Sequence, residues 1–164
     1  MEKINLYIDF DGVVLDTITK LYKDLEERHI IEEKDILKFF QDYNWNELVT
    51  DELIINDSIS CIQKIIDSDK FNLNILTHIN SLEEAVAKIR YLRKHFKDIT
   101  IIPCPKEISK TKMVHTKDAI LIDDYAGNLR EWEQDGGIPV RFSKKNNGKG
   151  YRVLDRLDKI IEMF

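Results

Sequence analysis

The chain has 164 residues, the length of one ordinary domain with room for a small insertion. Hydrophobic residues make up 43% and charged residues 34%, a balance that allows a globular protein to bury a substantial core. The formal net charge is -5, which argues against a general nucleic-acid binder because such proteins usually carry a basic surplus. It does not exclude a phosphorylated small molecule, since a local cation or metal can override the global charge.

The first residues lead directly into a strand-like run, with no pattern of a secretory signal before it. No apolar run approaches the roughly 20 residues that are needed to cross a bilayer. Cys61 and Cys104 lie far apart, and we expect free thiols rather than a disulfide. We therefore expect a cytoplasmic protein without a membrane partner.

Short apolar runs alternate with amphipathic segments along most of the chain. Residues 4–9 predict a buried first strand, and further runs predict strands at 71–77, 99–103, 119–123 and 138–142. Helical periodicity follows at 82–96, 128–134 and 151–164. Alternating strands and helices predict an α/β protein, with a Rossmann-like parallel sheet that carries helices on both faces.

The predicted helix at 82–96 has a recognisable start and an apolar stripe. Ser81 and Glu84 have the spacing of a capping box. The stripe consists of Leu82, Val86, Ile89 and Phe96.

Roughly 60 residues separate the first strand from the second, too many for one crossover helix. The intervening segment, 17–68, has helical character throughout. We expect it to form a small helical cap, inserted into a core made of residues 1–16 and 69–164. The polar segment 143–150 is expected to be a surface loop.

Polar residues lie at the carboxyl ends of the predicted strands, the edge at which open α/β sheets bind ligands. Asp9 and Asp11 leave the first strand and are followed by Gly12. Buried carboxylates are costly unless they are paired or bind a metal, so this pair indicates a functional site. Thr77 ends the second strand, where its hydroxyl could donate to a phosphate oxygen, although a helix cap or turn is the more usual role.

The loop before the fourth strand offers a cation for the same site: Lys106, Lys110 or Lys112. Asp123 and Asp124 end that strand, and adjacent acids repel each other unless a cation intervenes. Mg²⁺ binds a few carboxylates together with a phosphate and waters, so Asp9 and one of these two acids would suit it. The other acid could cap the following helix.

Together, D-x-D-G-V at 9–13, threonine at 77, a lysine in the loop and D-D at 123–124 resemble the haloacid dehalogenase-like (HAD) phosphohydrolase superfamily. The resemblance spans nearly the whole chain. Residues 122–125, with Asn128, Leu129 and Trp132 and then 136–138, look like the 5'(3')-deoxyribonucleotidase-like branch. Proteins of that branch also carry a short helical cap after the first motif.

The resemblance implies a role for each motif residue. Asp9 would attack phosphorus and form an aspartyl-phosphate, and Asp11 would act as general acid and then as general base. Mg²⁺ would be held by the Asp9 carboxylate, the Asp11 carbonyl and Asp123 or Asp124. Thr77 would bind the transferring phosphoryl group together with a lysine, for which the loop motif favours Lys110 and then Lys112.

The cap stretch 39–45 is dense in aromatic residues, which either fill the cap core or stack on a nucleobase. Tyr43 and Trp45 have polar edges and are the better candidates for substrate contacts. The leading hypothesis is a (deoxy)ribonucleoside monophosphate phosphatase. The alternatives are a phosphatase for a sugar phosphate and a binding protein that no longer turns over. Polymeric nucleic acid is not expected as a partner, and the cap and strand edges could support a homodimer.

Overall fold

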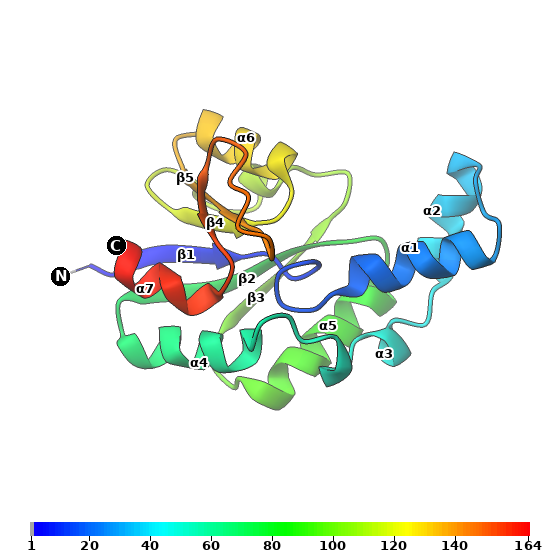
Figure 1. Ribbon diagram of the computed structural model, residues 1–164, viewed down its shortest axis with the longest axis horizontal. Coiled ribbons are helices and arrows are strands. Elements are labelled where there is room, and N and C mark those ends of the chain that lie inside the picture. Colours follow the sequence, from blue (N-terminus) through cyan, green and yellow to red (C-terminus); the bar gives the residue numbers. More distant parts are fainter. Residues whose placement is uncertain (1) are drawn as a thin grey trace.

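The computed structural model describes residues 2–164, and within this range six parallel strands form one sheet. The strands lie in the order β3-β2-β1-β4-β5-β6, so the chain order reverses between β1 and β4 (Figure 1). Their bounds are β1 Ile4–Ile8, β2 Phe71–Ile79, β3 Thr100–Pro105, β4 Ile120–Asp123, β5 Ile138–Phe142 and β6 Arg152–Leu154. In such sheets, ligands bind beyond the carboxyl ends of the strands at the reversal.

Helices cover both faces of this sheet, as the sequence predicts. Helices α4, α5 and α7 lie on one face and α6 lies on the other (Figure 1). Their bounds are α4 Ser58–Ser68, α5 Leu82–His95, α6 Ala126–Gln134 and α7 Ile160–Met163. The architecture is therefore a Rossmann-like α/β sandwich. No helix within residues 2–164 is long and apolar enough to cross a membrane.

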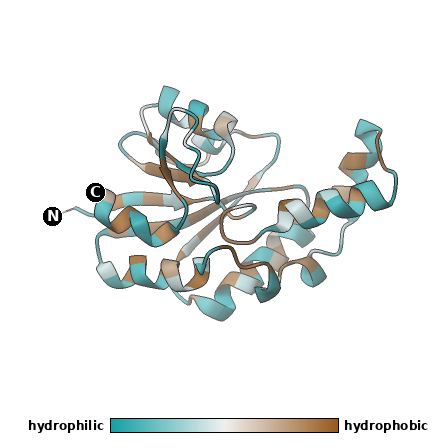
Figure 2. Ribbon diagram, viewed as in Figure 1, coloured by the Kyte–Doolittle hydropathy of each residue, from teal (hydrophilic) through white to brown (hydrophobic). Residues whose placement is uncertain are grey.

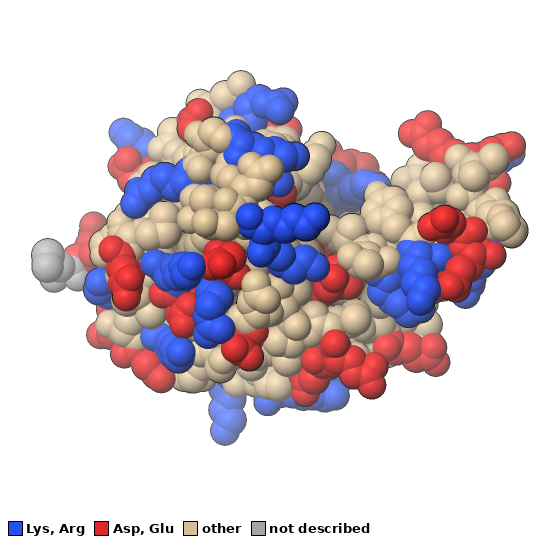
Figure 3. All heavy atoms as spheres, viewed as in Figure 1, with Lys and Arg blue, Asp and Glu red and all other residues tan. Residues whose placement is uncertain are grey.

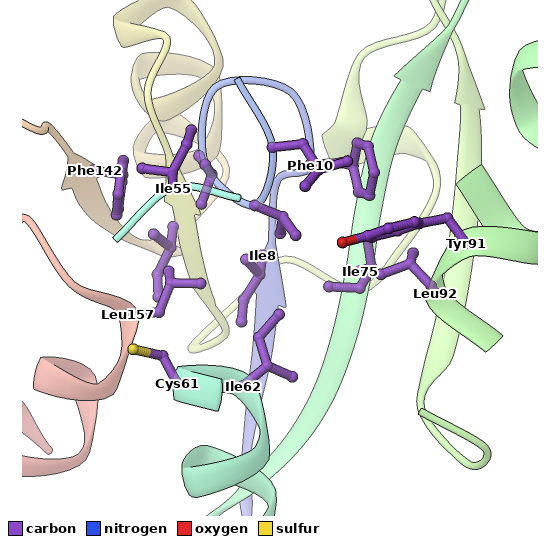
Figure 4. Packing of buried hydrophobic residues seen from close by; sticks show 14 of the residues in the cluster. Ile8, Phe10, Ile55, Cys61, Ile62, Ile75, Tyr91, Leu92, Phe142 and Leu157 are labelled. Atoms are coloured by element: carbon purple, nitrogen blue, oxygen red, sulfur yellow. The ribbon is translucent and has the colours of Figure 1, made fainter. Parts of the chain in front are cut away.

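Alternating side chains of β1 divide the core between the two faces. Leu6 and Ile8 belong to the larger cluster, where Ile62 of α4 lies beside Ile8 (Figure 4). Tyr7 points into the smaller cluster and meets Trp132 of α6 with ring centroids 5.5 Å apart. The central strands are therefore apolar on both faces, the pattern of a buried parallel strand. Hydrophobic residues concentrate along them in Figure 2.

Helix α5 buries only part of the stripe formed by its spaced apolar residues. Leu82 is 77% exposed and Val86 is 48% exposed. The inward face instead carries Glu84 and Lys88, both buried, beside Tyr91. Tyr91 packs edge-on against Phe10 at 6.2 Å (Figure 4). Of the stripe, Phe96 is buried in the core, whereas Leu82 and Val86 face solvent because the buried pair of Glu84 and Lys88 takes the inward positions of the first turns.

The C-terminal segment also differs from the expected single helix over 151–164. It forms the edge strand β6, the 3₁₀ helix η3 (Leu157–Lys159) and only one helical turn, α7. The backbone of Val140 to Phe142 pairs with β6, and Leu154 and Leu157 are buried in the core. The segment therefore first adds a strand to the sheet and then packs on one face of the sheet.

Cys61 and Cys104 are buried free thiols, and 143–150 is an irregular loop, as expected.

The insertion after β1 projects beyond the sheet as a group of short helices (Figure 1). They are α1 Thr17–Glu27, α2 Glu33–Asp42, α3 Trp45–Leu48 and the 3₁₀ helix η1 Asp51–Leu53. The two linkers that connect them to the core pair with each other: Asp16 N donates to Leu53 O at 2.8 Å, and Ile55 N donates to Val14 O at 3.1 Å. Helix α4, expected as part of the cap, instead packs on the sheet. We therefore propose that the cap ends near Leu53.

Candidate active site

The predicted site residues come from three neighbouring strands. Asp9 follows β1, Thr77 lies near the end of β2 and Asp123 ends β4. Because β1 lies between β2 and β4, and all three are parallel, their carboxyl ends meet at one edge. This edge lies at the reversal in strand order, where the sheet leaves room for a ligand.

A buried lysine joins two of these carboxylates. Lys110 Nζ donates to Asp9 Oδ1 at 2.8 Å and to Asp123 Oδ2 at 2.9 Å. Lys110 begins the short 3₁₀ helix η2 (Lys110–Lys112), whose N-cap Ser109 accepts from the Thr111 N–H. Although burial opposes its charge, Asp123 and Asp9 raise the pKa of Lys110, so it stays an ammonium. Among the three candidate lysines, Lys110 is the buried one that contacts the aspartates.

Asp123 is held by several donors. Besides Lys110, the Tyr125 N–H donates to Asp123 Oδ1 at 2.9 Å, and Asn128 Nδ2 donates to Oδ2 at 3.0 Å. Burial works against its charge, but Lys110 and these donors hold the pKa of Asp123 below its ordinary value. Asp123 is therefore a carboxylate that fixes the position of Lys110.

Asp124 has the opposite environment. Carboxylate oxygens of Asp9, Asp123 and Asp124 lie within 4.8 Å of one another. No N–H or hydroxyl group of residues 2–164 donates to Asp124, and burial and then the charge on Asp9 raise the pKa of Asp124 to about 9. Burial and the Asp123 carboxylate likewise raise the pKa of Asp9 to about 7. A cation would relieve this repulsion, so the donor set fits a hard divalent ion such as Mg²⁺.

Gly12 allows Asp124 to reach this position. The glycine has a φ of +79°, a left-handed conformation, and a Cβ atom there would lie 2.3 Å from Asp124 Oδ2. Any side chain would therefore be strained and would also displace the carboxylate. Sterics therefore explain the glycine of the D-x-D-G-V motif, because it leaves room for Asp124, the residue after β4.

Asp11 leaves β1 two residues after Asp9 and is held on both carboxylate oxygens. Thr17 Oγ1, at the start of the cap helix α1, donates to Asp11 Oδ1 at 2.5 Å. Lys88 Nζ, from α5 of the core, donates to Asp11 Oδ2 at 2.6 Å. Asp11 therefore lies where cap and core meet.

Sequence reasoning missed Lys88, which also reaches Thr77. Lys88 Nζ donates to Thr77 Oγ1 at 2.9 Å and to Glu84 Oε2 at 2.6 Å. Although burial opposes its charge, Asp11 and Glu84 raise the pKa of Lys88. The i,i+4 spacing of Glu84 and Lys88 was the available signal, but this spacing is typical of exposed ion pairs on helices.

The two aromatic residues predicted to contact substrate lie in different places. Trp45 is buried, donates from Nε1 to Phe40 O at 3.1 Å and covers Lys88, whose Nζ lies 5.2 Å from its ring centroid. Tyr43 donates to Asp24 inside the cap, so the structure does not bring it to the aspartates. Burial and this carboxylate raise the pKa of Tyr43 to about 12.

Phe40 is a further aromatic residue of the cap, and its ring lies near a lysine of the core. It is partly buried, and Lys106 Nζ of the core lies 5.6 Å from its ring centroid. A cavity of about 1010 Å³ lies within the cap beside Tyr43, and neither Asp9 nor Asp123 lines it. On the face shown in Figure 3, acidic and basic side chains are interspersed over cap and core.

No family model matches the sequence, and no curated protein does. Solved structures do match, and HAD-superfamily hydrolases are among them. A HAD hydrolase of family IA, variant 3, from Entamoeba histolytica aligns with a TM-score of 0.59 at 12% identity, over 97% of this chain and 99% of that one. β-Phosphoglucomutase from Clostridium difficile aligns with a TM-score of 0.61 at 13% identity, over 97% and 93%.

A third similar structure is D,D-heptose 1,7-bisphosphate phosphatase from B. bronchiseptica, complexed with magnesium and phosphate. It aligns with a TM-score of 0.56 at 15% identity, over 99% of this chain and 97% of that one. The protein therefore has the HAD-like fold. At these identities the similarity describes the fold, and the activity must be argued from the site.

Proposed function

We propose that this protein is a magnesium-dependent phosphomonoester hydrolase that works through an aspartyl-phosphate on Asp9. The observation that carries the proposal is the arrangement around Asp9: Lys110 at 2.8 Å on one side, and the otherwise unpaired carboxylate of Asp124 within 4.8 Å on the other. A buried carboxylate between a cation and a metal-binding set is suited to attack a phosphoryl group.

The chain's own residues account for both halves of the reaction. The Asp9 carboxylate attacks phosphorus, the ester P–O bond breaks, and Asp11 gives a proton to the leaving alkoxide. Asp11 then takes a proton from water, which attacks phosphorus and frees Asp9 and inorganic phosphate. Lys110 and Thr77 bind the phosphoryl oxygens, and Lys110 keeps Asp9 ionised for attack.

The residues that would hold Mg²⁺ are the carboxylates of Asp9 and Asp124 and the carbonyl of Asp11. Asp123 would act behind them by holding Lys110, because its oxygens already accept three hydrogen bonds. When bound, Mg²⁺ supplies the positive charge that lowers the repulsion between nucleophile and phosphoryl group. This assignment makes Asp124 the metal ligand of the pair.

We propose a nucleoside monophosphate as the substrate. Phe40 supports this choice, since its ring projects from the cap toward Lys106 of the core and offers a surface for a base. A sugar phosphate is the second candidate. It is supported by the similar structures, which include a heptose bisphosphate phosphatase and a phosphoglucomutase.

A substrate panel tests the proposal. Phosphate release is measured with Mg²⁺ and with EDTA on nucleoside 5'- and 3'-monophosphates and on sugar phosphates, with Asp9→Asn as the inactive control. We expect magnesium-dependent release that is fastest for a nucleotide. Release from no ester would refute the hydrolase, and equal or faster turnover of sugar phosphates would refute the nucleotidase.

A further inference from the structure

Lys88 is a buried cation with more partners than its charge requires. Its side chain is fully buried, and Nζ lies within hydrogen-bond distance of oxygens of Asp11, Glu84, Thr77 and His78, at 2.6 to 3.1 Å. An ammonium has three protons, so these four oxygens share them. A buried ammonium needs one carboxylate for neutrality, and it has two.

Glu84 is the partner that holds Lys88 in place. It lies one turn earlier on α5, is also buried, and is itself held because Oε1 accepts from the Asn80 N–H at 2.8 Å. The rings of Phe10 and Trp45 lie 5.3 and 5.2 Å from Lys88 Nζ and cover it. The ammonium is therefore fixed by its own helix and shielded by two rings without any contribution from Asp11.

Asp11 is the partner that a purely structural pair would not need. It lies 77 positions away in the chain, on the loop after β1. The same ammonium contacts Thr77, the proposed ligand of the phosphoryl group. One cation thus joins the side chain that transfers protons to the side chain that binds phosphate.

We propose that Lys88 is a positioning residue for Asp11, held by Glu84, and that this pair orients the Asp11 carboxyl group, which gives its proton to the leaving oxygen and later takes one from water. The inference rests on the proposed function, because it assigns Asp11 the acid and base steps. It adds α5 to the catalytic machinery, which the motif residues alone do not include.

The variants must remove the cation without leaving a buried charge. Lys88→Met alone would leave the buried Glu84 carboxylate without its cation and would destabilise the protein, so the test variant is Lys88→Met with Glu84→Gln, which removes both charges at similar volume. The matched control is Asp155→Asn with Lys159→Met, an i,i+4 pair far from Asp11 in the chain, whose side chains are 33% and 54% exposed. Glu84→Gln alone is a milder variant, since Asp11 still balances Lys88.

The readout is the dependence of kcat/KM on the leaving group. An alkyl phosphate needs a proton on its leaving oxygen, whereas p-nitrophenyl phosphate needs it far less. For the double variant we expect kcat/KM to fall about 10- to 100-fold on the alkyl ester and clearly less on the aryl ester. Glu84→Gln should show the same pattern more weakly, and the matched control should match wild type.

A second measurement separates positioning from structural damage. In an Asp11→Asn background, the Lys88→Met/Glu84→Gln change should cause no further loss, because its effect acts through Asp11. If the wild-type protein hydrolyses esters, three results would overturn the inference. They are equal losses on both esters, a further loss in the Asp11→Asn background, and wild-type rates in the double variant. A wild-type protein that hydrolyses no ester would instead overturn the proposed function, and this inference with it.

Discussion

The ammonium of Lys110 lies 2.8 Å from Asp9 Oδ1, so the proposed nucleophile has its counterion inside the protein. Burial and Asp123 push the pKa of Asp9 upward to about 7, and Lys110 opposes this shift. In the proposed mechanism the lysine has two tasks, to keep Asp9 ionised and to bind the phosphoryl group. Asp123 keeps it in place.

Replacement of this cation should therefore impair both catalysis and stability. We expect Lys110→Met to lower kcat/KM by about 100-fold or more and to lower the free energy of unfolding by about 3–5 kcal/mol, because two buried carboxylates lose their partner. Steady-state kinetics and urea unfolding measure the two effects. Lys112→Met removes an exposed lysine two residues away and should change neither. Similar losses in both variants would contradict the assignment.

The two acids at the end of β4 should respond differently to substitution. Asp124→Asn should abolish the rise in melting temperature that Mg²⁺ gives the wild-type protein, since ligand binding stabilises only a protein that binds it. Asp123→Asn should mainly lower the melting temperature without Mg²⁺, because Asp123 accepts from Lys110, Tyr125 and Asn128. Thermal unfolding with Mg²⁺ and with EDTA measures both. A magnesium response that survives in Asp124→Asn would show that another group holds the ion.

The cap should lose stability in acid through Asp24. Hydrogen bonds from Lys20 and Tyr43 hold the pKa of Asp24 below its ordinary value. A lowered pKa gives stability that is present above the unfolded-state pKa of about 4 and is lost as the pH falls through the folded-state pKa. We therefore expect Asp24→Asn to be less stable than wild type at neutral pH, with the difference shrinking below about pH 4. Denaturant unfolding at several pH values measures this, and a constant difference would contradict it.

Phe40 and Tyr43 should differ in their effect on substrate affinity. Stacking on a base contributes about 1–3 kcal/mol, so Phe40→Leu should raise the KM for a nucleoside monophosphate about 5- to 100-fold. Tyr43→Phe should leave this KM unchanged and should lower stability by about 1 kcal/mol, because its hydroxyl donates to Asp24 within the cap. The reverse pattern would place the base against Tyr43.

Much of the fold follows from the sequence because the central strands are buried on both faces. Continuous apolar runs that end in polar residues, as from Ile4 to Asp9, identify both a parallel strand and the edge where its ligands lie. For the same reason, Asp9, Asp11, Thr77 and Asp123 could be grouped before their contacts were known. Their order along the chain sufficed, since parallel strands place their carboxyl ends together.

The remaining features depend on tertiary contacts that local patterns do not encode. Strand β6 has only three residues, too few to show a period, and pairing with β5 makes it a strand. On α5, Glu84 and Lys88 are buried because they neutralise each other, and Lys88 also pairs with Asp11. Periodicity assigns such residues to the solvent. Among the cap aromatics, the partner of Tyr43 is Asp24, 19 positions earlier, which no spacing rule predicts.

The central claim is that Asp9 becomes phosphorylated during turnover. Wild-type protein, mixed with a ³²P-labelled substrate and Mg²⁺ and quenched in acid within milliseconds, should carry an acid-stable label that hydroxylamine releases, as expected of an acyl phosphate. Peptide mapping should locate the label on Asp9, and Asp9→Asn should carry none. Phosphate release without labelled protein, or a label on another residue, would contradict the mechanism.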